Sequence, residues 1–154
     1  MRKLRKIGLA LLALLAVVTL FTQPRKSDKA GAELLSGTEI PSQVLATLKR
    51  SCADCHSEAT RYPWYSYVAP TSWLVAEDVA NGRRHLNLSA WSDYPMVRRQ
   101  RSLSEIANQV RDRGMPPSIY TLIHPDAVLS DADRDAIFRW TQAERARLIE
   151  STLR

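Results

Sequence analysis

The chemically most distinctive part of this sequence is the stretch Cys52–His56, which reads Cys-Ala-Asp-Cys-His. It contains both cysteines of the chain and one of its three histidines. Cysteines three residues apart lie on one side of a helical turn, so their sulfurs can bond to the two vinyl groups along one edge of a porphyrin. The histidine that follows can bind the iron while a neighbouring acceptor holds its second ring nitrogen. The spacing predicts one covalent haem c, attached through Cys52 and Cys55 and ligated by His56.

Three other kinds of site also use a pair of cysteines. A thioredoxin-like redox pair needs a βαβ context, which the surrounding sequence does not show. A zinc site needs four ligands, and no second ligand pair is spaced to complete one. A plain structural disulfide between Cys52 and Cys55 is compatible with an exported chain. A zinc site could also use His56 with both cysteines, but it would still lack a fourth ligand. Haem attachment is favoured because both cysteines, His56, the export signal and the upstream helix all agree with it.

The second axial ligand of the iron is expected to be a methionine. Met115 follows Gly114 and precedes two prolines, and a proline disfavours the helical conformation of the residue before it. A short rigid segment can thus present the Met115 thioether to the haem, and a thioether opposite histidine raises the iron's reduction potential. The alternative role for Met115 is to fill the hydrophobic core. Met96, His85 and His124 are the rival ligands.

Aromatic residues gather in two segments that are expected to be loops. They can either wall a haem or form the core, and in a domain this small the two roles overlap. They are Trp64, Tyr65, Trp73, Trp91 and Tyr94. Arg83 and Arg84 could pair with haem propionates, and ordinary surface arginines are the equal alternative.

The formal net charge of +6 lies in one place. Residues 1–29 hold seven of the 22 Lys and Arg and one of the 16 Asp and Glu, so they account for the whole excess. The rest of the chain is neutral overall, which removes the main electrostatic reason to expect binding to nucleic acid.

The leader has the shape of a secretory signal or a short membrane anchor. A basic start precedes an uncharged apolar run of 15 residues, Ile7–Phe21. This run is shorter than the ~17–25 residues of a spanning helix, but Thr22 and Gln23 can extend it, and no good cleavage site follows. Because no good cleavage site follows, we expect an uncleaved anchor in the inner membrane, and a cleaved leader would instead leave the domain secreted to the periplasm. Because bases cluster more tightly before the run than after it, we expect a cytoplasmic amino terminus and an exported domain.

The remaining chain reads as helices, because no segment shows sustained alternation of apolar and polar residues. The expected helix boundaries rest on caps, prolines and glycines. Helices are expected from Pro41 into Cys52, from Thr71 or Ser72 to Asn81 with Gly82 as the stop, from Ser102 in a capping box with Glu105 to Gly114, and from Ser130 to about Leu148. Long loops are expected over 57–70 and 83–101. The expected divisions are a signal peptide or membrane anchor over 1–23, a linker over 24–38 and a c-type haem-binding domain over 39–154.

Beyond the attachment motif, the sequence resembles the bacterial haem-binding domain family of small exported c-type proteins over about residues 39–145. The matching stretches include Ser51–Ser57, Tyr62–Ser66, Val68–Val75, Asp78–Arg83, His85–Asn87, Ser89–Trp91, Gly114–Pro117, Tyr120, His124–Ala127, Leu129, Ser130 and Trp140. The resemblance implies an all-α, cytochrome-c-like fold with long loops around one haem, with haem attachment at Cys52 and Cys55 and iron ligation by His56. The stretch from Met115 through the last helix is also similar to segments of bacterial dihaem cytochrome c peroxidases.

These observations favour an electron carrier rather than an enzyme. The expected function is one-electron transfer by a monohaem c-type cytochrome that is held near membrane or periplasmic redox proteins. The alternative is a haem enzyme, peroxidase-like, or a haem-based gas or redox sensor with a labile sixth ligand.

Overall fold

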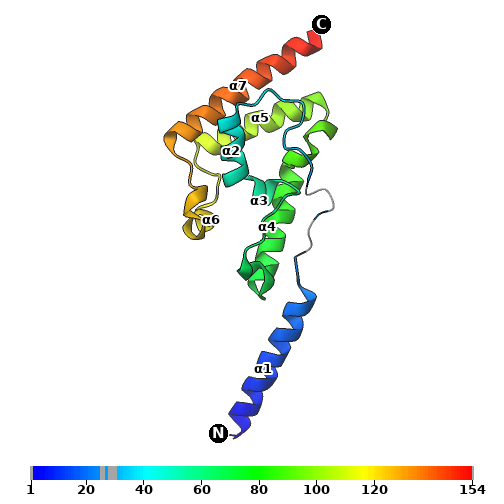
Figure 1. Ribbon diagram of the computed structural model, residues 1–154, viewed down its shortest axis with the longest axis vertical. Coiled ribbons are helices and arrows are strands. Elements are labelled where there is room, and N and C mark those ends of the chain that lie inside the picture. The colour runs from blue at the N-terminus through cyan, green and yellow to red at the C-terminus, as the bar shows by residue number, and fades with distance from the viewer. Residues whose placement is uncertain (1, 25–26, 28–30, 154) are drawn as a thin grey trace.

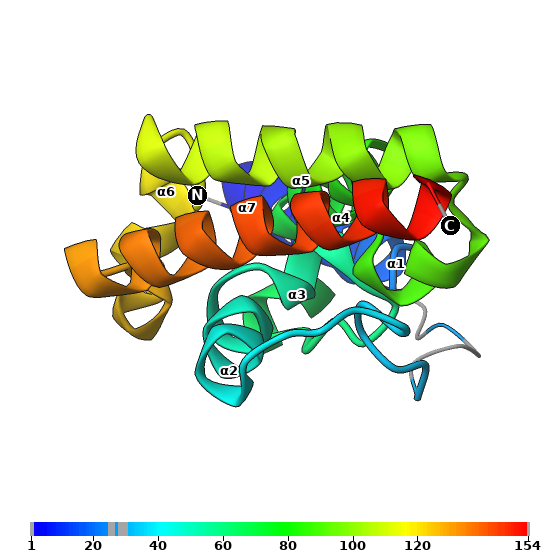
Figure 2. The same cartoon turned by 90° about the horizontal axis from the view of Figure 1, so that it is seen from above.

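The computed structural model describes the whole chain except residues 1, 25–26, 28–30 and 154. The described residues form helices joined by loops, with no β-strand among them, so the predicted all-α fold is confirmed (Figures 1 and 2). The elements are α1 (Arg2–Phe21), α2 (Ser42–Ser51), α3 (Ala53–His56), the 3-10 helix η1 (Trp64–Tyr67), α4 (Thr71–His85), η2 (Leu88–Asp93), α5 (Met96–Arg111), α6 (Ser118–Ile123), η3 (Pro125–Ala127) and α7 (Asp131–Leu153).

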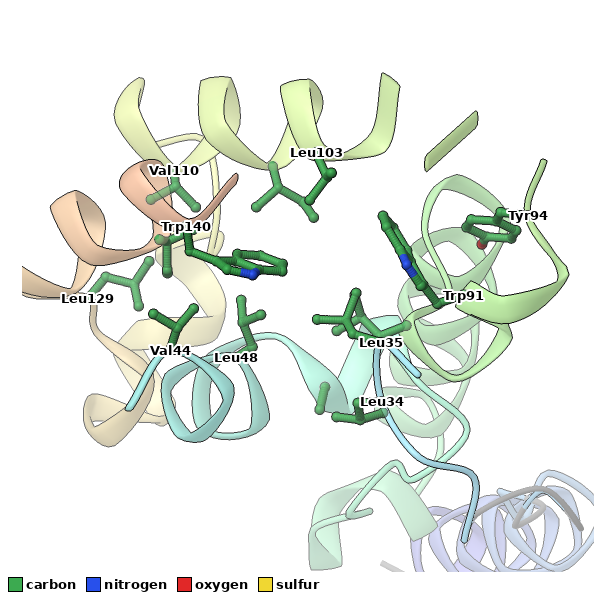
Figure 3. Close-up of a cluster of buried hydrophobic side chains, with 14 of the residues drawn as sticks. Leu34, Leu35, Val44, Leu48, Trp91, Tyr94, Leu103, Val110, Leu129 and Trp140 are labelled. Carbon is green, nitrogen blue, oxygen red and sulfur yellow. The ribbon is translucent and has the colours of Figure 1, made fainter. Parts of the chain in front are cut away.

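The core is built on α5 and α7, which lie antiparallel along one side of the domain (Figure 2). Leu103 on α5 and Ile137 on α7 are fully buried between them. Val44 and Leu48 of α2 reach the same cluster from the other side, as Figure 3 shows. Burying each such side chain stabilises the fold by about 1.5–3 kcal/mol. The core therefore holds α2, which runs directly into the cysteine segment, in a fixed position.

The segment expected to be a linker contributes to this core. Leu34 and Leu35 are buried beside Trp91 (Figure 3), and the Leu35 N–H donates to the Leu88 carbonyl at 2.9 Å. The ordered contacts of the domain thus begin before Glu39.

Three of the four predicted helix starts are confirmed, and one of them is that of α4, which begins at Thr71. Helix α2 begins directly after Pro41 and ends at Ser51, beside Cys52. At the start of α7, the Asp133 N–H donates to Ser130 Oγ at 3.1 Å and the Ser130 N–H donates to Asp133 Oδ2 at 3.0 Å. This reciprocal pair satisfies two backbone donors that the first helical turn cannot pair internally.

The predicted capping box at Ser102 and Glu105 is wrong. Helix α5 already begins at Met96, where Pro95 is extended, and Ser102 lies buried inside it. Residues 96–101 contain no helix breaker, so nothing prevents the helix from extending back to the proline. The loop expected over 83–101 is consequently much shorter, and η2 occupies most of it. The short helices η1, α6 and η3 were not predicted.

The predicted stop of α4 at Gly82 is also wrong, because the helix continues to His85. Glycine commonly ends helices through a left-handed backbone conformation, but Gly82 has none. Glycine is needed at position 82 because the helix lies very close to the backbone of Cys55 there.

Helix α1 is long and apolar enough to cross a membrane, as a signal sequence near the amino terminus also is. Its carboxyl-terminal end lies beside the junction of η1 and α4 (Figure 1). Thr22 Oγ1 lies 3.2 Å from Ser72 Oγ, and Gln23 Nε2 donates to the Tyr67 carbonyl at 3.3 Å.

Helix α5 ends in a hydrogen-bonded reversal at Arg113. The Gly114 N–H donates to the Gln109 carbonyl at 2.9 Å and the Arg113 N–H donates to the Val110 carbonyl at 3.4 Å, which is the Schellman pattern. Arg113 has a φ of 59° at the position where glycine is usual. A side chain in this left-handed conformation costs about 1–2 kcal/mol.

We therefore predict that Arg113→Gly raises the free energy of unfolding by about 0.5–1 kcal/mol, after allowing for the greater flexibility of glycine in the unfolded chain. The ion pair of Arg113 with Asp131 is solvent-exposed, so its loss should cost little. The matched control is Arg111→Gly in the last helical turn, which should lower stability by about 1 kcal/mol. Urea unfolding measures both, and equal destabilisation by the two variants would contradict the prediction.

Candidate haem site

The cysteine segment forms one compact turn between α2 and α4. Cys52 separates α2 from α3 with a φ of −128° and a ψ of −34°. The N–H groups of Cys55 and His56 both donate to the Cys52 carbonyl, at 3.3 and 3.0 Å. Cys52, Cys55 and His56 all line the same pocket. The structure thus brings the three sequence-predicted residues together as expected for one helical turn.

The two thiols are free and half-buried in the structure. Burial and, to a smaller extent, the neighbouring Cys55 together raise the pKa of Cys52 to about 12. Burial, together with the negative charges of Asp78 and Asp54, raises the pKa of Cys55 to about 11. Thiols with such pKa values stay protonated at neutral pH, unlike the activated thiolates of redox enzymes.

His56 is oriented by a backbone acceptor. Its Nδ1 lies 3.0 Å from the carbonyl oxygen of Leu86, and because a carbonyl can only accept, Nδ1 bears the hydrogen. The other nitrogen, Nε2, is then unprotonated in the neutral ring. Burial lowers the pKa of His56 and so favours that neutral form. A neutral imidazole whose second nitrogen donates to a carbonyl is the usual state of a metal-bound histidine.

Gly82 lets α4 approach the cysteine segment closely. A Cβ atom at this position would lie 2.5 Å from the carbonyl oxygen of Cys55, which is far inside van der Waals contact. The Gly82 carbonyl accepts from the Leu86 N–H at 2.9 Å. The extra turn of α4 beyond Gly82 therefore places the Leu86 carbonyl that orients His56.

The pocket has a volume of about 630 Å³, within the range of cofactor sites. Its walls come from α2, α3, α4, the start of η2, α5, α6 and the segment that joins α5 to α6. Its apolar lining consists of Leu48, Leu86, Leu88, Ile106, Val110, Met115, Pro116, Pro117 and Ile119. A hollow of this size with two cysteines, an oriented imidazole and a mainly apolar lining fits a haem.

Met115 lines this pocket and is half-buried. The Gln109 carbonyl accepts from both the Gly114 N–H and the Met115 N–H, at 2.9 and 3.2 Å. The reversal that ends α5 therefore fixes the backbone of Met115 at the pocket wall. Met115 shares the pocket with His56, as the sequence-based ligand hypothesis requires.

The three rival ligands lie in different places. Met96 packs against the hydrophobic core and does not line the pocket. The Nε2 of His124 lies 2.5 Å from the hydroxyl oxygen of Tyr65, and its ring stacks on Tyr120 with centroids 4.4 Å apart. His85 lines the pocket but is exposed at the end of α4.

Asp54, inside the motif, has a role that sequence reasoning missed. Its carboxylate accepts two bonds from the Arg61 guanidinium at 3.1 Å each and one from the Tyr120 hydroxyl at 3.0 Å. Burial raises the pKa of Tyr120, and the Asp54 carboxylate raises it further. This bond ties α3 to α6 across the edge of the pocket. No sequence pattern marks Asp54 for this role, because residue types between the two cysteines are not restricted.

The aromatic residues and Arg83 do not form the pocket wall that the sequence suggested. Trp91 and Tyr94 are buried in the core, whereas Trp64 and Trp73 are exposed, and none of the five predicted aromatic residues lines the pocket. Arg83 donates to the Ser57 carbonyl at 2.8 Å and pairs with Glu58 at 3.1 Å. It therefore holds the segment that follows the motif and does not line the pocket.

Comparison with known proteins agrees with this geometry. A family model described as haem-binding domain matches residues 12–143, so the chain belongs to the haem-binding domain family. The chain is also 28% identical over 127 residues to cytochrome c peroxidase Ccp of Escherichia coli (strain K12), a match that covers 79% of this chain. The match spans only 27% of that peroxidase's length. No solved structure matches the chain significantly.

The close contact at Gly82 predicts that Gly82→Ala lowers the free energy of unfolding, which is opposite to the effect of helix propensity. In an ordinary helix interior, Gly→Ala stabilises by about 1 kcal/mol, but Gly82→Ala should destabilise by about 1–3 kcal/mol because its Cβ overlaps the Cys55 backbone. Ala80→Gly, at an exposed position of the same helix, is the control and should cost about 1 kcal/mol through propensity alone. Urea unfolding measures both; a stabilising Gly82→Ala would refute the close approach.

Proposed function

We propose that this chain is a membrane-anchored, periplasm-facing monohaem c-type cytochrome that transfers single electrons. The observation that supports this most directly is the sharing of one pocket by Cys52, Cys55, the oriented imidazole of His56, and Met115. Haem bound there would supply an iron centre that alternates between the Fe(II) and Fe(III) states.

Each residue has a defined part in this proposal. The S–H groups of Cys52 and Cys55 would add across the two vinyl groups and fasten the cofactor covalently. His56 would bind the iron through Nε2, since Nδ1 is engaged with the Leu86 carbonyl. Met115 would bind through its thioether and exclude other ligands, and the apolar walls would limit the access of water.

The proposed periplasmic location of the domain is inferred from the sequence of α1. Its basic start favours a cytoplasmic amino terminus and therefore an exported domain. Membrane or periplasmic redox proteins are the expected partners.

The cofactor proposal is tested by intact mass and a pyridine haemochrome spectrum of the protein matured in a host that assembles cytochromes c. We expect the mass of the chain plus one haem and the spectrum of a haem with both vinyl groups consumed. Replacing Cys52 and Cys55 together with Ala should abolish covalent attachment, because both thioether bonds are then lost. A colourless wild-type protein at the bare polypeptide mass would refute the proposal.

The sixth ligand is tested by Met115→Ala. We expect the ferric spectrum to change from low-spin to high-spin and the reduced protein to gain CO binding, because the thioether is removed. Met96→Leu is the matched control and should leave the spectrum unchanged, since Met96 packs in the core. An unaltered low-spin spectrum in Met115→Ala would assign the ligand elsewhere, with His85 the next candidate to replace because it also lines the pocket.

A haem enzyme or a haem-based gas or redox sensor is the second candidate function, favoured by the similarity to cytochrome c peroxidase Ccp. It requires a labile or absent sixth ligand. Peroxide turnover or tight CO binding by the wild-type protein would favour it over electron transfer.

A further inference from the structure

The junction of η1 and α4 exposes an unusual number of large apolar side chains. Over residues 62–76 the chain has no charged residue, yet it contains two of the four Trp and three of the five Tyr. We call the exposed members the aromatic corner: Trp64 (78% exposed), Tyr67 (37%), Val68 (41%), Trp73 (51%) and Leu74 (62%). Contiguous exposed apolar surface on a small domain usually marks an interaction site.

The aromatic corner adjoins the end of the apolar helix α1 (Figure 1). The Ala69 N–H donates to Thr19 Oγ1 at 3.4 Å. The contacts of Thr22 with Ser72 and of Gln23 with the Tyr67 carbonyl continue the junction. The corner segment is thus attached at three points to residues 19–23, where α1 ends and the chain changes from apolar to polar.

The length of the apolar part of α1 determines the depth of this junction relative to a membrane. The apolar part of α1, residues 7–21, is about 22 Å long at about 1.5 Å per residue. The long side chains of the bases before it can extend to the headgroups on the cytoplasmic side, so the helix can still cross a hydrocarbon layer of about 30 Å. If α1 spans the membrane, residues 19–23 lie where hydrocarbon gives way to headgroups. The aromatic corner must then lie at that same level, with its apolar side chains against lipid.

We infer that the aromatic corner is a membrane-docking surface that inserts Trp64 and Trp73 into the headgroup layer of a phospholipid bilayer. This inference rests on the proposed anchoring by α1. Trp and Tyr have an apolar ring and a polar N–H or O–H, and they concentrate at the membrane interface for that reason. The absence of charge over residues 62–76 suits this apolar layer. The domain would have one orientation on the membrane rather than swinging on a free tether.

Quenching by brominated lipids tests the docking. The full-length haem protein is placed in phosphatidylethanolamine and phosphatidylglycerol nanodiscs, with or without bromine on the upper acyl carbons, and the ratio of Trp emission cancels quenching by the haem. Two of the four Trp lie at the corner and the other two, Trp91 and Trp140, are buried. We expect bromine to remove up to about half of the emission, and Trp64→Phe with Trp73→Phe to abolish that loss.

A matched control moves the fluorophore to the far end of the domain. In the Trp64→Phe, Trp73→Phe background, Ile149→Trp adds an exposed probe on α7, which lies farthest from α1 (Figure 1), and bromine should leave its emission unchanged. Equal quenching of wild type and the double Phe variant, or quenching at position 149, would overturn the inference. Carbonate extraction of native membranes tests the anchor separately: an extractable chain refutes anchoring, whereas an inextractable chain without corner quenching refutes only the docking.

Discussion

The contact between α3 and α4 is the constraint on which the site depends. With no side chain at Gly82, the helix backbone approaches the Cys55 carbonyl, and the helix then continues for one further turn. That turn places the Leu86 carbonyl at hydrogen-bonding distance from His56. The position of the two cysteines and the orientation of the imidazole therefore have one common cause, the closeness of two backbones. The hydrophobic core acts on this contact indirectly, because it fixes α2 and so the start of the cysteine turn.

A second, independent structural feature positions Met115, the other candidate iron ligand. The reversal at the end of α5 satisfies the backbone at Gly114 and Met115 through one carbonyl, that of Gln109. The packing of α5 against α7 sets the direction in which that reversal points. The pocket thus receives His56 from the α2–α4 side and Met115 from the α5–α7 side, and the bond between Asp54 and Tyr120 joins the two sides.

The residues that sequence could predict are those with local physical signatures. The cysteine spacing, the proline after Met115 and the reciprocal cap at Ser130 and Asp133 each act within a few residues, and the structure has the predicted turn, pocket position and cap. The wrong predictions have their causes in contacts between segments that are distant in the sequence. Gly82 resembles a helix stop, but its conformation is helical and a distant backbone explains it. Ser102 and Glu105 match a cap motif, but the packing of α5 continues through them. The partners of Asp54, Arg61 and Tyr120, come from a loop and a short helix that no local sequence pattern predicts.

The polar lining of the pocket has a consequence for electron affinity. Asp54, Asp78 and Glu105 line it, and no lysine or arginine does among the described residues. Under the proposed function, ferric haem has one more positive charge than ferrous haem, so these carboxylates would stabilise the oxidised state and oppose the thioether's effect on the potential. Arg61 offsets the charge of Asp54, whereas Asp78 and Glu105 are exposed and are screened by dissolved ions. The electron would then be held more tightly in concentrated salt than in dilute buffer.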